Sequence, residues 1–217
     1  MLKIEQISSG YGKKQVLFDI TLEIKQGEIV LLTGGNGSGK STLLKCIYNL
    51  IPLWKGKICF EGERIDHLKP SDLIKKGIVY IPQKDFCFES LTVDDNLRIA
   101  GNIYNKIELK NRLDNVYEQI GLYKFKNRKP FNLSGGEKKL LAFGMGLVHK
   151  PKIFLFDEPL AGTDAHHSQQ IIEIFSTYLL MQNISAIIVE HRKDDKMLHT
   201  LINKPVLMNL GTIQQIN

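Results

Sequence analysis

The feature that most constrains the fold is a glycine-rich loop between an apolar run and a helical pattern. The run IVLLT at residues 29–33 is followed by GGNGSGKST at residues 34–42, which fits the spacing GxxxxGK[ST]. The backbone N–H groups of such a loop face one point, and the next helix adds its partial positive charge, so phosphate binding is predicted. The predicted contacts are Gly34, Gly35, Asn36, Gly37, Ser38, Gly39, Lys40, Ser41 and Thr42.

Two kinds of strand pattern occur in the sequence. The continuous apolar runs IVLLT, IVYI, IFLF and AIIV are typical of strands covered on both faces of a parallel sheet. In the N-terminal part, residues around 3–7, 21–24 and 58–61 alternate apolar with polar residues and are separated by glycine-containing turns. These residues predict an antiparallel β-lobe beside the parallel sheet.

Helical patterns lie between the predicted strands. One is expected to begin after Lys40 and to stop at Pro52, and apolar spacing around residues 171–179 predicts another. Over about residues 84–147, apolar residues recur at helical spacing in a polar sequence, which indicates a helical insertion. We therefore predict an α/β fold with a mostly parallel core sheet, an antiparallel β-lobe and an α-helical insertion, in one domain spanning residues 1–217.

Polar side chains follow three of the predicted buried strands. Asp157 and Glu158 end the run IFLF, Gln83 follows IVYIP, and His191 follows AIIVE. Ligands of open parallel sheets bind beyond the carboxyl ends of the strands, so these residues are expected to meet the glycine-rich loop. Asp157 and the Ser41 hydroxyl are candidates for holding Mg²⁺, which prefers oxygen ligands, and Glu158 is placed to orient or deprotonate a water.

The segment LSGGEKKL at residues 133–140 begins a further helical pattern. Ser134 and Glu137 have the spacing of a capping box, which is a sufficient structural role. The two glycines that follow Ser134 leave the helix N-terminus bare, so it is also able to accept a phosphate from outside.

Composition excludes several other classes of protein. The longest apolar runs are far shorter than the roughly 20 residues of a membrane-spanning helix. The N-terminus lacks an apolar stretch of signal-peptide length, and the cysteines at positions 46, 59 and 87 have neither zinc nor disulfide spacing, so a cytoplasmic protein is expected. A net charge of +6 permits anionic partners, but the lysines are spread along the chain, and we expect a solvated surface and no direct nucleic-acid binding.

Taken in order, these motifs resemble those of ABC transporter nucleotide-binding subunits over essentially the whole chain. The family's aromatic A-loop, Walker A, Q-loop, signature, Walker B, D-loop and switch histidine correspond to Tyr11, GGNGSGKST, Gln83, LSGGE, IFLFDE, AGTD and His191. The stretches YIPQKDFCFESLTVDDNL, DEPLAG and VEH are similar to ATPases of branched-chain amino-acid importers and lipopolysaccharide exporters.

The resemblance implies a P-loop ATPase that binds ATP and Mg²⁺ and closes as a head-to-tail dimer. Each ATP would lie between the Walker A of one subunit and the signature of the other. Glu158 would be the general base, Lys40 and His191 would hold the terminal phosphates, and Gln83 would sense the Mg²⁺ held by Ser41 and Asp157. The remaining implied contacts are Tyr11 on adenine, the signature residues Ser134, Gly135 and Gly136 in trans, and Asp164 across the dimer.

The partners implied are transmembrane permease subunits and either a second copy or a paralogous ATPase. The chain would then lie on the inner face of the cell membrane, held there by the permease. Two alternatives stay open: a soluble ABC protein acting on ribosomes or DNA, and an ATP-dependent clamp or regulatory subunit that hydrolyses ATP poorly. Glu137, Met145 and Thr163 depart from the family's usual residues, which leaves the ATPase rate open.

Overall fold

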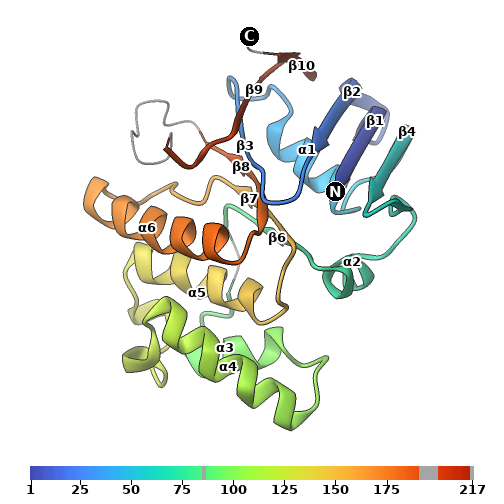
Figure 1. Ribbon diagram of the computed structural model, residues 1–217. Helices are drawn as coiled ribbons and strands as arrows, with labels where there is room; N and C mark the ends of the chain where they lie inside the picture. The colour runs from blue at the N-terminus through green and yellow to red at the C-terminus, as the bar shows by residue number, and fades with distance from the viewer. Residues whose placement is uncertain (85–86, 191–199, 216–217) are drawn as a thin grey trace.

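The computed structural model describes residues 1–84, 87–190 and 200–215, and it contains two β-sheets flanked by helices (Figure 1). The smaller sheet has the strand order β2-β1-β4-β5, and the larger one has the order β10-β9-β3-β8-β7-β6. No helix within these ranges is long and apolar enough to cross a bilayer.

The smaller sheet is the predicted antiparallel β-lobe. Its strands are β1 (Leu2–Tyr11), β2 (Lys14–Ile24), β4 (Leu53–Phe60) and β5 (Glu63–Arg64). Ile4 of β1 is paired with Leu22 on one side and with Ile58 on the other, and all three side chains are buried. The apolar residues of this lobe therefore share one face, as the alternating sequence pattern predicts.

The larger sheet contains the four predicted buried strands in parallel. Its strands are β3 (Ile29–Thr33), β6 (Ile78–Ile81), β7 (Ile153–Asp157), β8 (Ser185–Val189), β9 (Lys204–Asn209) and β10 (Thr212–Gln215). β9 pairs parallel with β3, and β10 pairs antiparallel with β9 at the edge. Neither β9 nor β10 was predicted, because β9 contains a proline and half-exposed positions in place of a continuous apolar run.

Alternate residues of the core strands face two separate hydrophobic cores. Ile29 and Leu31 contribute to a core shared with the helices α5 (Gly135–Leu147) and α6 (Ala165–Met181). Val30 and Leu32 contribute to a core shared with the helix α1 (Lys40–Ile47) and the antiparallel sheet. The parallel sheet is thus the middle layer, with helices on one side and α1 and the β-lobe on the other (Figure 1). This placement explains why its strands are apolar on both faces.

The helix after the glycine-rich loop is shorter than predicted. α1 spans Lys40–Ile47 and does not continue to the residues just before Pro52. Asn49 has a positive φ of 56°, and its side-chain amide donates hydrogen bonds to the carbonyls of Ile65 and Leu68. Asparagine tolerates this left-handed conformation, so the chain turns there and leaves the helix. A further helix, α2 (Pro70–Lys76), was not predicted.

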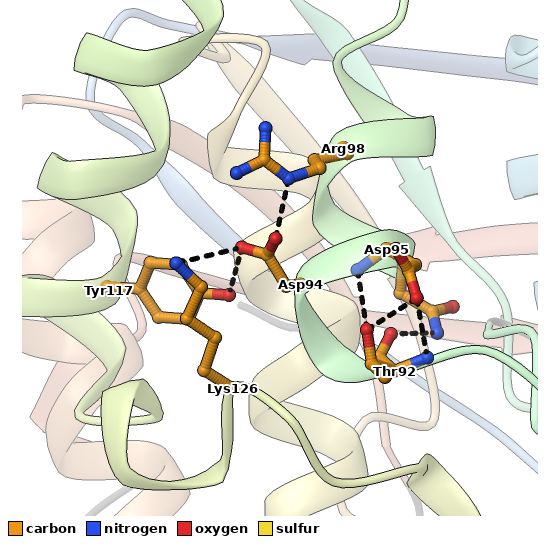
Figure 2. A network of polar contacts seen from close by, with 7 residues as sticks. Thr92, Asp94, Asp95, Arg98, Tyr117 and Lys126 are labelled. Carbon is orange, nitrogen blue, oxygen red and sulfur yellow. Dashed lines mark hydrogen bonds and ion pairs between the residues drawn. The ribbon is translucent and has the colours of Figure 1, made fainter.

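Three α-helices and two short 3₁₀ helices occupy most of the range of the predicted helical insertion. They are α3 (Val93–Ala100), α4 (Lys106–Ile120), η1 (Tyr123–Phe125), η2 (Pro130–Asn132) and α5 (Gly135–Leu147). Figure 2 shows Asp94 of α3 accepting hydrogen bonds from Arg98 and from Tyr117 of α4, and pairing with Lys126. This carboxylate joins α3 to α4 and to the segment before α5. α6 (Ala165–Met181) packs against α5.

Candidate active site

The glycine-rich loop has the geometry of an anion cradle. Gly39 is the N-cap of α1 with a φ of +104°, and Gly34 has a φ of +147°. A Cβ atom at Gly34 would come within 2.1 Å of the carbonyl oxygen of Met208 on β9, so no other residue fits there. The Lys40 ammonium donates hydrogen bonds to the carbonyls of Gly34 (2.9 Å) and Gly35 (3.0 Å), which places its charge inside the curve of the loop.

A cavity of about 370 Å³ opens beside this loop. Tyr11, at the end of β1, lies on its wall with 46% of the residue exposed, so its ring face is available to a planar ligand group. The Ser38 hydroxyl oxygen is buried and has no hydrogen-bond partner in the described part of the chain. A buried polar atom of this kind indicates a ligand contact, and the residues fit a bound nucleotide phosphate. The loop residues lining the cavity are Asn36, Gly37, Gly39, Lys40, Ser41 and Thr42.

The two oxygen ligands predicted for Mg²⁺, the Ser41 hydroxyl and the Asp157 carboxylate, lie together next to the loop. Ser41 Oγ donates a hydrogen bond of 2.7 Å to Asp157 Oδ1, and Tyr80 Oη donates one of 3.1 Å to Asp157 Oδ2. Burial and the neighbouring Asp157 charge raise the pKa of Tyr80, so the phenol stays protonated and remains a donor. A hydroxyl and a carboxylate are the hard ligands that Mg²⁺ takes beside phosphate and water, so this pair fits that ion.

Glu158, the next carboxylate along the chain, is held by Gln83, which lies two residues beyond β6. Gln83 Nε2 donates a short hydrogen bond to Glu158 Oε2. Glu158 has a positive φ of 52°, and its backbone N–H donates to the carbonyl of Val189 on β8. Glu158 also lines the cavity beside Tyr11 and the loop, so the structure brings this predicted base to the predicted phosphate site.

A lysine of α5 reaches the same group of carboxylates from outside the sheet. Lys139 is only 8% exposed, and its ammonium donates a hydrogen bond of 3.0 Å to the backbone carbonyl of Gln83. Burial lowers the pKa of Lys139, and the charges of Glu190, Glu158 and Asp157 oppose that shift. Neither Lys139 nor Tyr80 was singled out from the sequence. The sequence features that could have indicated them are a lysine on the apolar face of a helix, for Lys139, and a hydroxyl within an otherwise apolar strand, for Tyr80.

The segment LSGGE forms the expected capping box at the start of α5. Ser134 Oγ accepts a hydrogen bond from the Glu137 backbone N–H (3.2 Å), and Glu137 Oε2 accepts one from the Ser134 N–H (2.7 Å). The carboxylate that departs from the family pattern is therefore turned back onto its own helix. Ser134 and Gly135 are exposed, Gly136 is buried, and none of these three lines the loop cavity of the same chain.

The segment after Glu158 contains the buried departure Thr163. Its hydroxyl donates to the carbonyl of Leu160 (2.7 Å) and lies 2.7 Å from Ser168 Oγ, so the polar atom is satisfied. The carbonyl of Asp164 accepts hydrogen bonds from the backbone and hydroxyl of Ser168, which hold the start of α6. The Asp164 residue is exposed on this turn. His191, the remaining predicted site residue, lies outside the described residues.

Comparison with known proteins gives one family. The family model described as "ABC transporter" matches residues 17–161. A protein of Archaeoglobus fulgidus named probable branched-chain amino acid transport ATP-binding protein LivF is 41% identical over 162 residues, which are 74% of this chain and 69% of that protein. The high-affinity branched-chain amino acid transport ATP-binding protein BraG of Pseudomonas aeruginosa is 36% identical over 198 residues, or 91% of this chain and 84% of that protein.

Solved structures give the same result for the fold. One described as an ATP-binding cassette of an ABC transporter in its ADP conformation superposes with a TM-score of 0.87 at 27% sequence identity. The superposition covers 99% of this chain and 89% of the other. The P-loop, the two sheets and the helices described above are therefore arranged as in a nucleotide-binding cassette.

Proposed function

The chain belongs to the ABC transporter family, and from that premise we propose that it powers a membrane transporter by ATP hydrolysis, with Glu158 as the general base. The observation that carries this proposal is the meeting of the phosphate loop, the Ser41–Asp157 pair and the Gln83–Glu158 pair around one cavity edge. Three elements distant in sequence supply the parts that phosphoryl transfer needs.

ATP binding uses the loop and the end of β1. The N–H groups of the loop and the Lys40 ammonium would contact the phosphates, and Tyr11 would stack on the adenine at the open end of the cavity. Mg²⁺, when bound, neutralises phosphate charge, and Ser41 and Asp157 would hold it with Gln83 at its outer side. Asp157 is well suited to this role because both of its oxygens already accept hydrogen bonds.

Hydrolysis uses the carboxylate of Glu158. It would accept a proton from the attacking water, and the amide of Gln83 would orient the carboxylate before and during the reaction. His191 is proposed to contact the γ-phosphate, on the family resemblance and on its position two residues beyond β8.

A second ATPase subunit would complete each site. Ser134, Gly135 and Gly136 lie at an exposed helix N-terminus away from their own phosphate loop, which suits them to contact the nucleotide of a partner. Asp164 is exposed on the turn before α6 and would lie across that interface. The partner is a second copy or a paralogous subunit, and ATP would close the pair head to tail.

A permease subunit is the proposed membrane partner. A mainly apolar cavity of about 480 Å³ lies between β6 and the helices α3 and α5, and Pro82 on its wall directly precedes Gln83. A permease segment seated there would touch the residue next to the one that holds Glu158. This arrangement would place the chain on the inner face of the membrane.

The experiment that tests the proposal compares wild type with Glu158→Gln. Wild type should release phosphate from ATP with Mg²⁺, and Glu158→Gln should run as a dimer on size exclusion only when ATP is present. Glu173→Gln, which changes an exposed glutamate of α6, is the matched control and should behave as wild type. A Glu158→Gln protein that keeps wild-type turnover would remove Glu158 from the role of base.

A further inference from the structure

We propose that Lys139 is a positioning residue that couples the two ATP sites of the dimer, because it ties the helix that contacts one nucleotide to the base that acts on the other. The inference rests on the proposed function. It concerns a side chain that is not among the residues expected to touch ATP. Within one subunit, a chain of contacts leads from Lys139 on α5 to Glu158.

A continuous hydrogen-bonded path runs from α5 to Glu158. The Lys139 ammonium donates to the Gln83 carbonyl at 3.0 Å, and the side-chain amide of the same Gln83 donates to Glu158 Oε2. Two hydrogen bonds and one residue therefore separate α5 from the proposed base. A displacement of Lys139 changes where Gln83 lies, and Gln83 sets the orientation of the Glu158 carboxylate.

The electrostatic setting of Lys139 holds its ammonium in place. The Lys139 residue is buried, and so are Glu190 and Asp157, whose charges act on its ammonium. A buried charge is tolerated only where opposite charges and hydrogen bonds compensate it, so this lysine is bound tightly to its position. Moving or removing it would leave carboxylates of the site with less compensation, which is a large effect in a medium of low dielectric constant.

Lys139 lies close to the N-cap of its helix. Ser134 is the N-cap of α5, and Lys139 lies five residues further, about 7.5 Å along the axis at the rise of an α-helix. Gly136, between them, is buried, and the capping box fixes the first turn. The two ends of this short segment therefore move together. A partner's phosphate bound at Ser134 would shift the Lys139 ammonium and, through it, the Gln83 carbonyl.

The neighbouring lysine provides a matched comparison. Lys138, the residue before Lys139, pairs instead with Glu89 Oε1 at 2.9 Å. Lys138→Met removes the same charge from the same helix as Lys139→Met, but it breaks the ion pair with Glu89 and keeps the hydrogen bond from Lys139 to the Gln83 carbonyl. Any difference between the two variants reports the path through Lys139.

The test is the ATP dependence of phosphate release by the full chain. Wild type is expected to give a sigmoidal curve, since each site contains residues of both subunits. Lys139→Met should lower the Hill coefficient to near one and reduce kcat by about tenfold, while the ATP concentration at half-maximal rate changes by less than about twofold. Lys139→Arg, which keeps the charge and the donor, should recover most of both quantities, and Lys138→Met should match wild type.

Some results would overturn the role of Lys139 and leave the proposed ATPase function standing, and others would overturn both. Lys139→Met with a wild-type Hill coefficient and kcat, or a wild type that hydrolyses ATP without cooperativity, excludes coupling through Lys139 and leaves the ATPase intact. If neither wild-type turnover nor ATP-dependent dimerisation of Glu158→Gln is seen, the homodimer itself is wrong, and this inference is overturned with it. If Lys139→Met does not fold, as judged by thermal unfolding, Lys139→Gln is measured instead against the same two outcomes.

Discussion

Tyr80 donates a hydrogen bond through Oη to Asp157 Oδ2 at 3.1 Å, on the side of the carboxylate opposite Ser41. The ring of Tyr80 at the same time lines the apolar cavity between β6 and the helices α3 and α5. One side chain thus contacts both the proposed metal ligand and the proposed permease surface. The carboxylate is oriented from two directions before it meets an ion.

The first prediction concerns this hydroxyl. Tyr80→Phe keeps the ring in the cavity and removes the donor, so Asp157 is held on one side only. A hydrogen bond to a charged group contributes about 1.5–3 kcal/mol, and the Mg²⁺ concentration for half-maximal ATPase rate should rise by about tenfold. ATP binding measured in EDTA should stay unchanged, because the loop is intact. An unaltered Mg²⁺ requirement would show that Ser41 alone positions Asp157.

A second prediction separates the two roles of Ser134. Ser134→Ala removes the N-cap and should lower the stability by about 1 kcal/mol, whereas Ser134→Asp keeps a good cap and should be close to wild type. The aspartate places a negative charge where a partner's phosphate would bind. In a Glu158→Gln background, Ser134→Asp should therefore abolish ATP-dependent dimerisation, as measured by size exclusion, without loss of thermal stability. Dimerisation that survives this change would exclude the contact in trans.

The departure at Thr163 gives a third prediction. Thr163→Val keeps the shape and removes a buried hydroxyl that donates to the Leu160 carbonyl. Losing this hydrogen bond and the contact with Ser168 Oγ should destabilise the protein by about 1 kcal/mol and lower the Tm by about 2–4 °C. The matched change Thr177→Val, on α6, should have a smaller effect. A variant as stable as wild type would indicate that the Thr163 backbone N–H, which also donates to the Leu160 carbonyl at 3.3 Å, satisfies that carbonyl by itself.

The fourth prediction is a dependence of stability on pH. Burial, with a smaller effect of Arg112, lowers the pKa of His149 to about 4. A histidine in an unfolded chain has a pKa of about 6.5. Between that pH and pH 4 the unfolded chain therefore binds more protons than the folded chain. The free energy of unfolding is not reduced by His149 above this window, and it falls as the pH drops through the window. His149→Gln should reduce the loss of stability between pH 7.5 and pH 5 in urea titrations. An equal loss in both proteins would assign the effect to other groups.

Sequence reasoning located the strands and motifs whose patterns are local. IVLLT, IFLF and AIIV are fully buried strands, and IVYI is buried except for the partly exposed Tyr80. Runs this short with β-branched and aromatic residues favour strands over helices. β9 was missed because it is held by register with β3 and not by its own composition. Met208 of that strand nevertheless forms a wall of the phosphate loop, so its role depends on tertiary structure alone.

The same limit applies to the candidate site. Glu158 and Gln83 were predicted because each follows a buried strand, and their direct contact is a consequence of strand order. Lys139 lies next to another lysine in sequence, and only the packing of α5 distinguishes the buried Lys139 from the partly exposed Lys138. The rotation of α5 about its axis decides which of the two adjacent lysines faces the site. The capping box predicts where the helix begins, but it does not predict this rotation.

The central strand of the parallel sheet has a consequence for the order of folding. β3 precedes the phosphate loop, yet both of its neighbours, β8 and β9, come from residues 185–209 near the other end of the chain. Contacts of such sequence separation form slowly and late. During synthesis the ribosome releases the loop long before the strands that flank β3, so the GGNGSGKST segment becomes a rigid cradle only after residues 185–209 have emerged. The phosphate loop therefore gains its final support only when β8 and β9 have paired with β3.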